Sequence, residues 1–579
     1  MTSAPVTYRG GMIRPRRLPA AAALVVGILA VTACTPSGAS EKAGTTTVTM
    51  SPDAGLTVLA DTDETAASVA TSRALFETAP LVVVAPAGAA EAQNVAARAA
   101  VALGVPLLID GPAAVPTAGD AQTEPTPPAD STDAPTPLDD ELTRLDTTTA
   151  VVVGDAAGTS LDESLTVVQV EATVTAASAT IGHTLTEPAS ADPATFAAEI
   201  AALEATTATE ATDTSNTGGT STPSDDIPAL ERPAPIDDTA AIAIDGAAQL
   251  ASIATARSAG IPVHLLTGGS ANPQANASVI DALHASKTDK TLAIGAAFGA
   301  EPALDWKVRT ARSGTQLPGG GQLLFENHQF VAIYGTPTTS VLGVLGEQDA
   351  AGSVERARQV AAPFQALSPK TVVPMFEIIA SVAAGGPGDD GNFSNELSPE
   401  SLKPWIDAAA DAGIYVVIDL QPGRTDFLTQ AKQYQSLLEL PNVGLALDPE
   451  WRLAPDQRHL HDIGSVSAAE VNSVTHWLAD LTNEKGLPQK MLVVHQFRPS
   501  MLTDREALDL SRPEIGMLLH VDGQGGQPDK QATWANIKRD APAGVAWGWK
   551  NFYDEDTPML TPEQTMSKVH PTPELITYQ

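Results

Sequence analysis

The sequence predicts an α/β protein in two parts: doubly wound parallel-sheet repeats, followed by a C-terminal TIM-like (β/α) barrel. With 579 residues, the chain exceeds one ordinary domain. Continuous apolar strand candidates alternate with helical patterns, which is typical of parallel sheets covered on both faces. From residue 329 onward, such alternations repeat over about 250 residues, which is the usual length of a (β/α) barrel.

The first part contains one strand–helix unit twice, and together the copies predict a domain over residues 53–305. The first copy has strand candidates at 81–85, 104–109 and 150–154, with a helix at 90–103. The second copy has strand candidates at 241–244, 260–266 and 292–295, with helices at 247–258 and near 279–285. Because the apolar strand runs are continuous, we expect each copy to form a parallel sheet covered by helices.

Three segments differ from this pattern. Residues 112–137 and 206–235 are rich in Pro, Thr, Ser and Asp, and carry too little apolar surface to offset the entropy of ordering. We therefore expect disordered insertions near these positions. Residues 35–52 have the same character and predict a flexible tether.

The repeated units resemble cell wall binding repeat 2, a surface-layer module of Gram-positive bacteria. The similarity lies in residues 61–76, 85–109 and 141–154, and is strongest over the Ala-rich stretch 96–108. The resemblance implies non-covalent binding of a wall polymer. A scaffold role for a doubly wound domain is the alternative, because a strongly acidic surface repels anionic polymers.

The second part, residues 326–579, carries the barrel pattern. Its strand candidates are 330–334, 372–377, 415–419, 444–448, 491–495, 516–520 and 545–549. Apolar residues at helical spacing occur at 354–367, 401–412, 426–438 and 468–484. The alternation predicts a closed barrel whose functional residues lie at the carboxyl ends of the strands.

Nearly every strand candidate of this part ends in polar or aromatic residues. These are Tyr334, Glu377, Asp419, Gln421, Arg424, Asp448, Glu450, His495, Asp522, Trp547, Trp549 and Lys550. A barrel that served only as a spacer would not need acids, bases and aromatic residues at one rim. We therefore expect these side chains to surround an open site, with Trp547 and Trp549 stacking on sugar rings.

Asp448 and Glu450 form the most specific motif at this rim. Side chains two residues apart on a strand share a face, so both carboxyls are expected to project into the barrel mouth. Neighbouring carboxylates disfavour double ionisation, and a carboxyl that stays protonated can act as the general acid of a glycosidase. We predict Glu450 as the acid, with Asp448 or Glu377 as its partner. Pairing of the acids with Arg424 or Arg452 is the alternative.

The Asp-x-Glu motif resembles the fourth-strand motif of family 18 glycoside hydrolases and of family 25 lysozymes. In family 18, the Glu protonates the leaving oxygen and the Asp supports the N-acetyl group of the substrate. The resemblance implies these roles for Glu450 and Asp448. From their positions at the strand ends, we expect the substrate to be held by Tyr334, Asp419, Gln421, Arg424, His495, Asp522 and Lys550. A non-catalytic glycan- or wall-binding surface protein is the second hypothesis.

The C-terminal part also resembles an uncharacterised group of actinobacterial lipoproteins and secreted proteins. The shared segments are 334–337, 342–347, 419–424, 447–452 and 548–554. This resemblance implies an architecture and a location in the cell envelope, but no activity.

The N-terminus carries the features of a lipoprotein signal peptide over residues 1–34. Basic residues precede an apolar run at 18–30, and residues 31–34 are Val-Thr-Ala-Cys. This resembles the lipobox, in which the cysteine is acylated. We therefore expect a lipid anchor on Cys34 and a position on the extracytoplasmic face of the cell membrane.

Composition excludes several classes of function. The net charge is −36, and no basic footprint for nucleic acid is present. Cys34 is the only cysteine, which leaves no thiol for a metal cluster or a disulfide. A metal set of His495, His520, Asp522 and Glu377 can be written across the strands, but the sequence favours neither a metal nor a cofactor.

Overall fold

The computed structural model describes residues 47–48, 55–111, 136–155, 161–204, 224–228, 230, 232 and 234–579. The predicted signal peptide with Cys34 lies outside these residues, as does most of the two predicted insertions. The described parts depart from our expectation at several places, two of which lie at the ends of predicted irregular segments. Thr47 and Val48 of the predicted tether form β1 (Thr47–Val48), which pairs with β3 (Phe76–Thr78). Thr136 and Pro137 of the first predicted insertion begin a helix.

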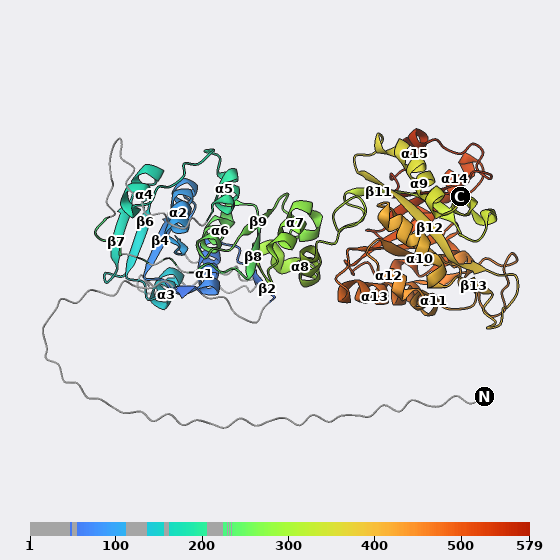
Figure 1. The fold of residues 1–579 in the computed structure, drawn as a ribbon, viewed down its shortest axis with the longest axis horizontal. Helices are drawn as coiled ribbons and strands as arrows, with labels where there is room; N and C mark the ends of the chain where they lie inside the picture. The colour runs from blue at the N-terminus through green and yellow to red at the C-terminus, as the bar shows by residue number, and fades with distance from the viewer. Residues whose placement is uncertain are drawn as a thin grey trace, which may run out of the picture. The chain divides into compact units, whose positions relative to one another are not determined.

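The first part contains two parallel four-stranded sheets, as the repeated pattern predicts (Figure 1). The first has the strand order β5(Leu107–Asp110), β4(Leu81–Pro86), β6(Thr149–Val153), β7(Thr166–Val170). The second has the order β9(Val263–Leu266), β8(Thr239–Ile244), β10(Lys290–Ile294), β2(Leu56–Leu59). The two orders match position by position, except that β2, from the start of the domain, takes the place that β7 has in the first sheet.

The helices of this part cover both sheets. They are α1(Glu64–Leu75), α2(Ala90–Leu103), α3(Pro137–Arg144), α4(Val174–Ile181), α5(Phe196–Ala202), α6(Leu250–Ser258), α7(Ala277–Ser286) and α8(Leu304–Ser313). Helix α6 packs against α1 and α2. One cluster of buried side chains includes strand residues of both sheets, such as Val83 and Ala241. The two copies of the repeat therefore share a core.

The second part is a closed parallel barrel, which confirms the predicted fold class. Its strands in chain order are β11(His328–Gly335), β12(Thr371–Ala383), β14(Tyr415–Leu420), β15(Val443–Leu447), β17(Lys490–Gln496), β19(Ile515–Val521), β20(Ala546–Asn551) and β21(Leu575–Tyr578). Each strand pairs with the next, and β21 and β12 both pair with β11, which closes the ring. The last strand, β21, completes the barrel but was not among the strand candidates.

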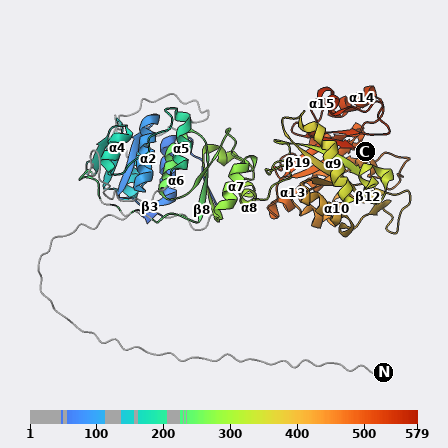
Figure 2. The same ribbon diagram turned by 45° about the horizontal axis from the view of Figure 1, so that its top comes forward.

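The barrel helices surround these strands (Figure 2). They are α9(Ala350–Gln365), α10(Pro399–Asp411), α11(Phe427–Gln433), α12(Gln435–Leu438), α13(Ala468–Glu484), α14(Gln527–Lys538) and α15(Pro562–Lys568). The single helix expected over 426–438 is divided at Tyr434, which leaves the helical conformation. The short strands β13(Ser394–Glu396), β16(Val466–Ser467) and β18(Leu502–Thr503) lie in the connections.

The interior of the barrel changes character along the strands. Side chains toward the strand starts, such as Phe330, Met375 and Val493, form a buried hydrocarbon cluster. Toward the carboxyl ends, the inward positions become polar, as in Tyr334 and Asp419. Because side chains alternate along a strand, the hydrocarbon floor and the polar top lie on the same inner face. Among the helices of the described residues, none is long and apolar enough to cross a bilayer.

Candidate active site at the barrel mouth

A cavity of about 540 Å³ opens at the carboxyl ends of the strands. Six of the predicted site residues line it: Tyr334, Gln421, Asp448, Glu450, Asp522 and Lys550. Trp451, His459, Phe497 and Phe552 also line it, although the sequence did not single them out for this purpose. The predicted convergence of polar strand ends on one open site therefore holds for these residues.

Asp448 and Glu450 reach the cavity by a different route from the one expected. The strand β15 ends at Leu447, and a 3-10 turn, η7 (Pro449–Trp451), follows. Asp448 caps this turn: its Oδ1 accepts a hydrogen bond from the Glu450 N–H at 3.2 Å. Both side chains still line the cavity, but not as neighbours on one face of a strand. Proline at the first position of the turn explains the change, because it cannot continue the ladder.

The turn that carries Glu450 is held in place by a close backbone contact. The Gly464 N–H donates to the Glu450 carbonyl oxygen at 2.7 Å. A Cβ at position 464 would lie 2.5 Å from the carbonyl oxygen of Arg452, so only glycine fits there. This contact fixes the backbone from which the Glu450 carboxyl projects.

The pairing of the acids with Arg424 or Arg452 is not observed. Arg452 pairs with Glu470 at 3.0 Å, and the Arg424 guanidinium lies 4.2 Å from the centre of the Phe393 ring. Within the part of the chain that the structure describes, Glu450 has no ion pair. Arg424 also does not line the cavity, contrary to our expectation that it holds the substrate.

Under the cavity floor lies a buried chain of charged side chains. His495 Nδ1 lies 2.7 Å from Asp522 Oδ2, and its Nε2 lies 2.8 Å from Glu377 Oε1. His520 Nδ1 contacts the other Asp522 oxygen at 2.6 Å, and its Nε2 lies 3.1 Å from the Thr577 hydroxyl. We call Glu377, His495, His520 and Asp522 the buried relay.

The charges of the buried relay follow from its contacts. The carboxylates of Asp522 and then Glu377 outweigh burial and raise the pKa of His495 well above its usual value. In return, the His495 imidazolium lowers the pKa of Glu377 and holds that of Asp522 well below its usual value. Burial lowers the pKa of His520, which suits a neutral ring. The relay is therefore one imidazolium between two carboxylates.

Asp419 lies beside the relay and is equally buried. The Tyr334 hydroxyl donates to Asp419 Oδ2 at 2.8 Å, while Oδ1 has no partner. Burial, with a smaller effect from Glu377, raises the pKa of Asp419 to about 6. Because Asp419, His495 and Glu377 are fully buried beneath the floor, they do not meet a ligand directly in this geometry. They position the groups above them.

The acids that line the cavity differ in the direction in which their pKa values are shifted. Burial and then the Asp419 carboxylate raise the pKa of Asp448 well above its usual value. Burial and then the Asp522 carboxylate raise the pKa of Glu450. Asp522, in contrast, stays ionised. The cavity is therefore lined by carboxyl groups whose pKa values are shifted apart, which is the arrangement that acid–base chemistry on one substrate needs.

Lys550 supplies the positive charge of the cavity wall. Its Nζ lies 3.7 Å from the centre of the Tyr334 ring and 3.6 Å from Asp522 Oδ2. The carboxylate of Asp522 and then that of Glu377 outweigh burial and raise the pKa of Lys550. An ammonium in this position can donate to a hydroxyl or an oxyanion of a ligand.

Trp547 and Trp549 do not face the mouth. Trp549 is 1% exposed and packs edge to face on Trp534 of α14, at 5.5 Å between ring centres. Trp547 contacts the same ring at 5.8 Å. On β20, the inward positions are Gly548 and Lys550, so the tryptophans alternate outward. Our expectation that they stack on sugar rings is therefore corrected, and Trp451 offers the cavity an indole instead.

The buried relay contains donors that could hold a metal ion: donor atoms of His495, His520 and Asp522 lie within 4.8 Å of one another. Each of these atoms already has a side-chain partner in the relay. An ion would have to displace the proton-mediated contacts described above. The arrangement therefore gives no reason of its own to assign a metal.

Comparisons with known proteins find distant similarity to solved structures. No family model matches the chain, and no curated protein matches it. Cwp6 from Clostridium difficile aligns with 58% of this chain and 64% of its own, at 11% identity and a TM-score of 0.26. This chain therefore spans less than two-thirds of the length of Cwp6. D-psicose 3-epimerase, solved in the presence of D-fructose, aligns with 43% of this chain and 84% of its own, at 12% identity and a TM-score of 0.24. Likeness at this level carries no argument about activity.

Proposed function

We propose that the barrel acts on a cell-envelope glycan as a glycoside hydrolase-like enzyme, with Glu450 as its general acid. One observation carries the proposal: the carboxyl groups of Asp448, Glu450 and Asp522 line the same cavity, with pKa values shifted in opposite directions. Glycosidases require this combination, because one carboxylic acid protonates the leaving oxygen while a carboxylate supports the opposite face of the sugar.

Each part of the cavity has a role under this proposal. The pKa of Glu450 is raised, and Glu450 has no ion pair among the described residues, which suits a group that protonates a glycosidic oxygen. The ionised Asp522 stabilises the positive charge that develops on the sugar ring in the transition state. Lys550, Tyr334 and Gln421 bind hydroxyls, and Trp451 provides an aromatic face for a sugar.

Asp448 supports the reacting group in this scheme. Its raised pKa favours the protonated carboxyl, which can donate to an acetamido oxygen or a ring substituent. This agrees with the role that the family 18 resemblance implies. Glu377, which we expected as an alternative partner of Glu450, is bound to His495 beneath the floor, so we assign it a positioning role through the buried relay.

A non-catalytic glycan-binding barrel is the second candidate, and one observation favours it. Both Asp522 oxygens accept hydrogen bonds, one from His495 and one from His520. A carboxylate held in this way is a weak nucleophile and a weak base. If the cavity only binds, Glu450 and Asp448 serve as hydrogen-bonding groups.

The decisive experiment compares Glu450→Gln with the wild type on peptidoglycan and on actinobacterial wall polysaccharide. Loss of a general acid is expected to lower the release of reducing ends by about 10²–10⁴-fold. Glu439→Gln is the matched control, because Glu439 pairs with Lys485 at 3.3 Å and does not line the cavity. Equal turnover in all three proteins contradicts the hydrolase. Glycan binding without turnover in any of them supports the second candidate.

The proposal places the barrel outside the cell, on a lipid anchor at Cys34. The support is the signal-like segment before Cys34, which lies outside the described residues. Cys34→Ser is expected to move the protein from the membrane fraction to the medium or to leave it unprocessed. Membrane retention of a fully processed Cys34→Ser protein would contradict the anchor.

A further inference from the structure

A second cavity, separate from the barrel, lies in the first part of the chain. It is a groove of about 420 Å³, within the range of small-molecule sites. The groove runs between the first turns of α2 and α4, and the segment 187–191 forms its third wall. We call it the α2–α4 groove.

An unpartnered amide lies in the wall of the α2–α4 groove. Asn94, in the second turn of α2, is 1% exposed, and its Oδ1 has no hydrogen-bond partner. Leaving such a group buried and unpaired destabilises the fold. An apolar side chain of similar size would fill the position without that cost. The amide is therefore best explained by a ligand that pairs with it.

The wall opposite Asn94 is held in place by a buried ion pair. Arg98, one turn after Asn94, is 2% exposed and pairs with Glu199 of α5. Glu199 Oε2 also accepts a hydrogen bond from the Ala189 N–H at 3.2 Å. The start of the same segment is fixed by the Leu185 N–H, which donates to the Ser178 hydroxyl at 3.1 Å. The groove is thus formed before a ligand arrives.

The lining of the groove defines the chemistry of that ligand. Val95, Val174 and Phe196 provide an apolar surface. The rim carries the hydroxyls of Thr173, Thr175 and Ser190 and the carboxylates of Glu91 and Glu187. The carboxylates disfavour an anionic ligand. Together with the hydroxyls, they can form hydrogen bonds with a ligand ring that carries several hydroxyl groups.

We propose that the α2–α4 groove binds an N-acetylated amino sugar. The acetamido N–H can donate to the unpaired Asn94 Oδ1. Its methyl group fits the apolar surface, and the hydroxyls of the ring meet the polar rim. This inference does not depend on catalysis by the barrel, because the groove shares no residue with the barrel mouth.

The test measures binding of the β-1,4-linked N-acetylglucosamine trimer to the full chain by titration calorimetry. The wild type is expected to bind it, and Asn94→Leu is expected to weaken binding at least tenfold. Because the leucine removes an unpaired buried amide, the melting temperature of Asn94→Leu should equal or exceed that of the wild type. Thr175→Trp, at the exposed rim, should block binding by filling the groove and serves if Asn94→Leu does not fold.

Two comparisons make the test specific. Gln274→Leu is the matched control: Gln274 is 1% exposed, and both its amide atoms lack partners, but it does not line the groove. It should bind the trimer like the wild type. Unchanged binding by both groove variants overturns the proposal. So does equal affinity for the glucosamine trimer, the glucose trimer or trialanine.

Discussion

The two parallel β structures of this chain differ in the residues at and just beyond the carboxyl ends of their strands. In the sheets of the first part, β6 and β10 each end in an apolar residue followed by glycine, Gly154 or Gly295. In the barrel, the corresponding positions carry Tyr334, Glu377, Asp419, Asp448, His495, Asp522 and Lys550. The same strand–helix alternation therefore supports two different uses of a strand end.

The difference shows that buried charged groups are concentrated at the strand ends of the barrel. Hydrocarbon and glycine at strand ends let helices pack closely, which stabilises a sheet. Charged groups at strand ends must instead compensate one another, because isolated buried charges are costly. The buried relay achieves this with one imidazolium between two carboxylates. The barrel mouth thus gathers charged groups that compensate one another, which the ends of β6 and β10 do not.

The largest expected effect comes from breaking the buried relay. His495→Leu leaves Glu377 and Asp522 buried without the imidazolium that holds them both. Removing one partner of such a pair is expected to lower the free energy of unfolding by about 3–5 kcal/mol. Urea denaturation at pH 7 measures it. In a Glu377→Gln background the same change should cost clearly less, and equal costs in both backgrounds would show that the relay is not a charge-compensated unit.

Much of this contrast could be predicted from the sequence. The continuous strand runs indicated both fold types, and polar residues such as Glu377, Asp448 and Lys550 marked one end of the barrel. The prediction was wrong about facing direction at β20, where alternation allows either Trp549 or Lys550 to point inward. Gly548 carries the missing signal: a Cβ there would lie 2.2 Å from the His520 ring. Glycine inside a strand marks such close approach.

Other features depend on contacts between distant segments and could not be predicted. The contacts of His495 with Glu377 and Asp522 join three strands, so no local pattern reveals them. The 3-10 turn after Asp448 could in principle be predicted from Pro449. The strand β2 completes the sheet of the second repeat copy by pairing with β10. A short apolar run at 56–59 does not indicate which sheet it joins, so this pairing could not be predicted.

A second prediction concerns the buried Asp419 carboxyl beside the relay, whose ionisation is expected to lower the free energy of unfolding. The folded-state pKa of Asp419, about 6, lies above its ordinary value of about 4, so the folded protein binds this proton more tightly than the unfolded chain. The free energy of unfolding should therefore fall as the pH rises from about 4 to about 6. Asp419→Asn mimics the protonated acid and still accepts from the Tyr334 hydroxyl. The variant is expected to remove this decline and to be more stable than the wild type at pH 7 by about 1–3 kcal/mol.

To test this prediction, the free energy of unfolding of the wild type and of Asp419→Asn is measured from pH 4 to pH 8. Their curves should meet near pH 4 and separate above it. An Asp419→Asn protein that is less stable than the wild type at pH 7 would mean that the ionised carboxylate is stabilised by the relay.

The third prediction concerns the strand ends in the sheets of the first part. Neighbouring elements pack closely against these strand ends, which requires small residues there. Gly154 has a φ of +88°, and a Cβ there would lie 2.9 Å from the Ala92 Cβ. Gly295, at the same place in the second sheet, has a φ of +137°, and its Cβ would lie 2.8 Å from Ile244 Cγ1. Gly154→Ala and Gly295→Ala are each expected to lower the free energy of unfolding by about 1–3 kcal/mol.

Gly55→Ala is the control for this pair, since its Cβ meets nothing within 4 Å and its φ is not in the left-handed region. It should change the free energy of unfolding by less than about 0.5 kcal/mol. Thermal melts of the full chain compare the three variants. If only one of the two strand-end glycines proves sensitive, the two sheets are not equivalent copies.

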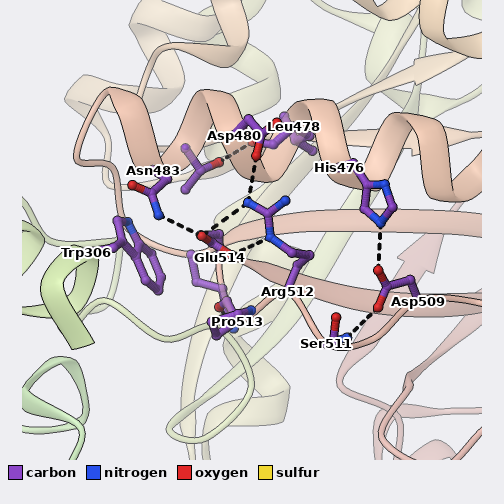
Figure 3. A network of polar contacts seen from close by, with 12 residues as sticks. Trp306, His476, Leu478, Asp480, Asn483, Asp509, Ser511, Arg512, Pro513 and Glu514 are labelled. Carbon is purple, nitrogen blue, oxygen red and sulfur yellow. Dashed lines mark hydrogen bonds and ion pairs between the residues drawn. The ribbon is translucent and has the colours of Figure 1, made fainter. Parts of the chain in front are cut away.

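The smallest effect is expected from an ion pair on the barrel surface. Comparing it with the buried relay tests whether burial, and not charge alone, makes the ion pairs of the mouth important for stability. His476 Nε2 lies 2.6 Å from Asp509 Oδ2, beside the contacts of Arg512 with Asp480 and Glu514 (Figure 3). Hydrogen bonds from Ser511 and His476 lower the pKa of Asp509 to about 2. This folded-state value is below the ordinary one, so the contribution is present above about pH 4 and disappears as the pH falls toward 2.

His476→Gln is therefore expected to lower the free energy of unfolding by only about 0.2–1 kcal/mol at pH 5, because the His476 side chain is 50% exposed and solvent screens the pair. The difference should shrink in 1 M salt, where the screening length is about 3 Å, and should nearly vanish at pH 2. Urea denaturation under these three conditions measures it. A loss as large as that of His495→Leu would mean that ion pairs anywhere on the barrel stabilise it equally, and the contrast between a charged mouth and the rest of the fold would no longer rest on burial.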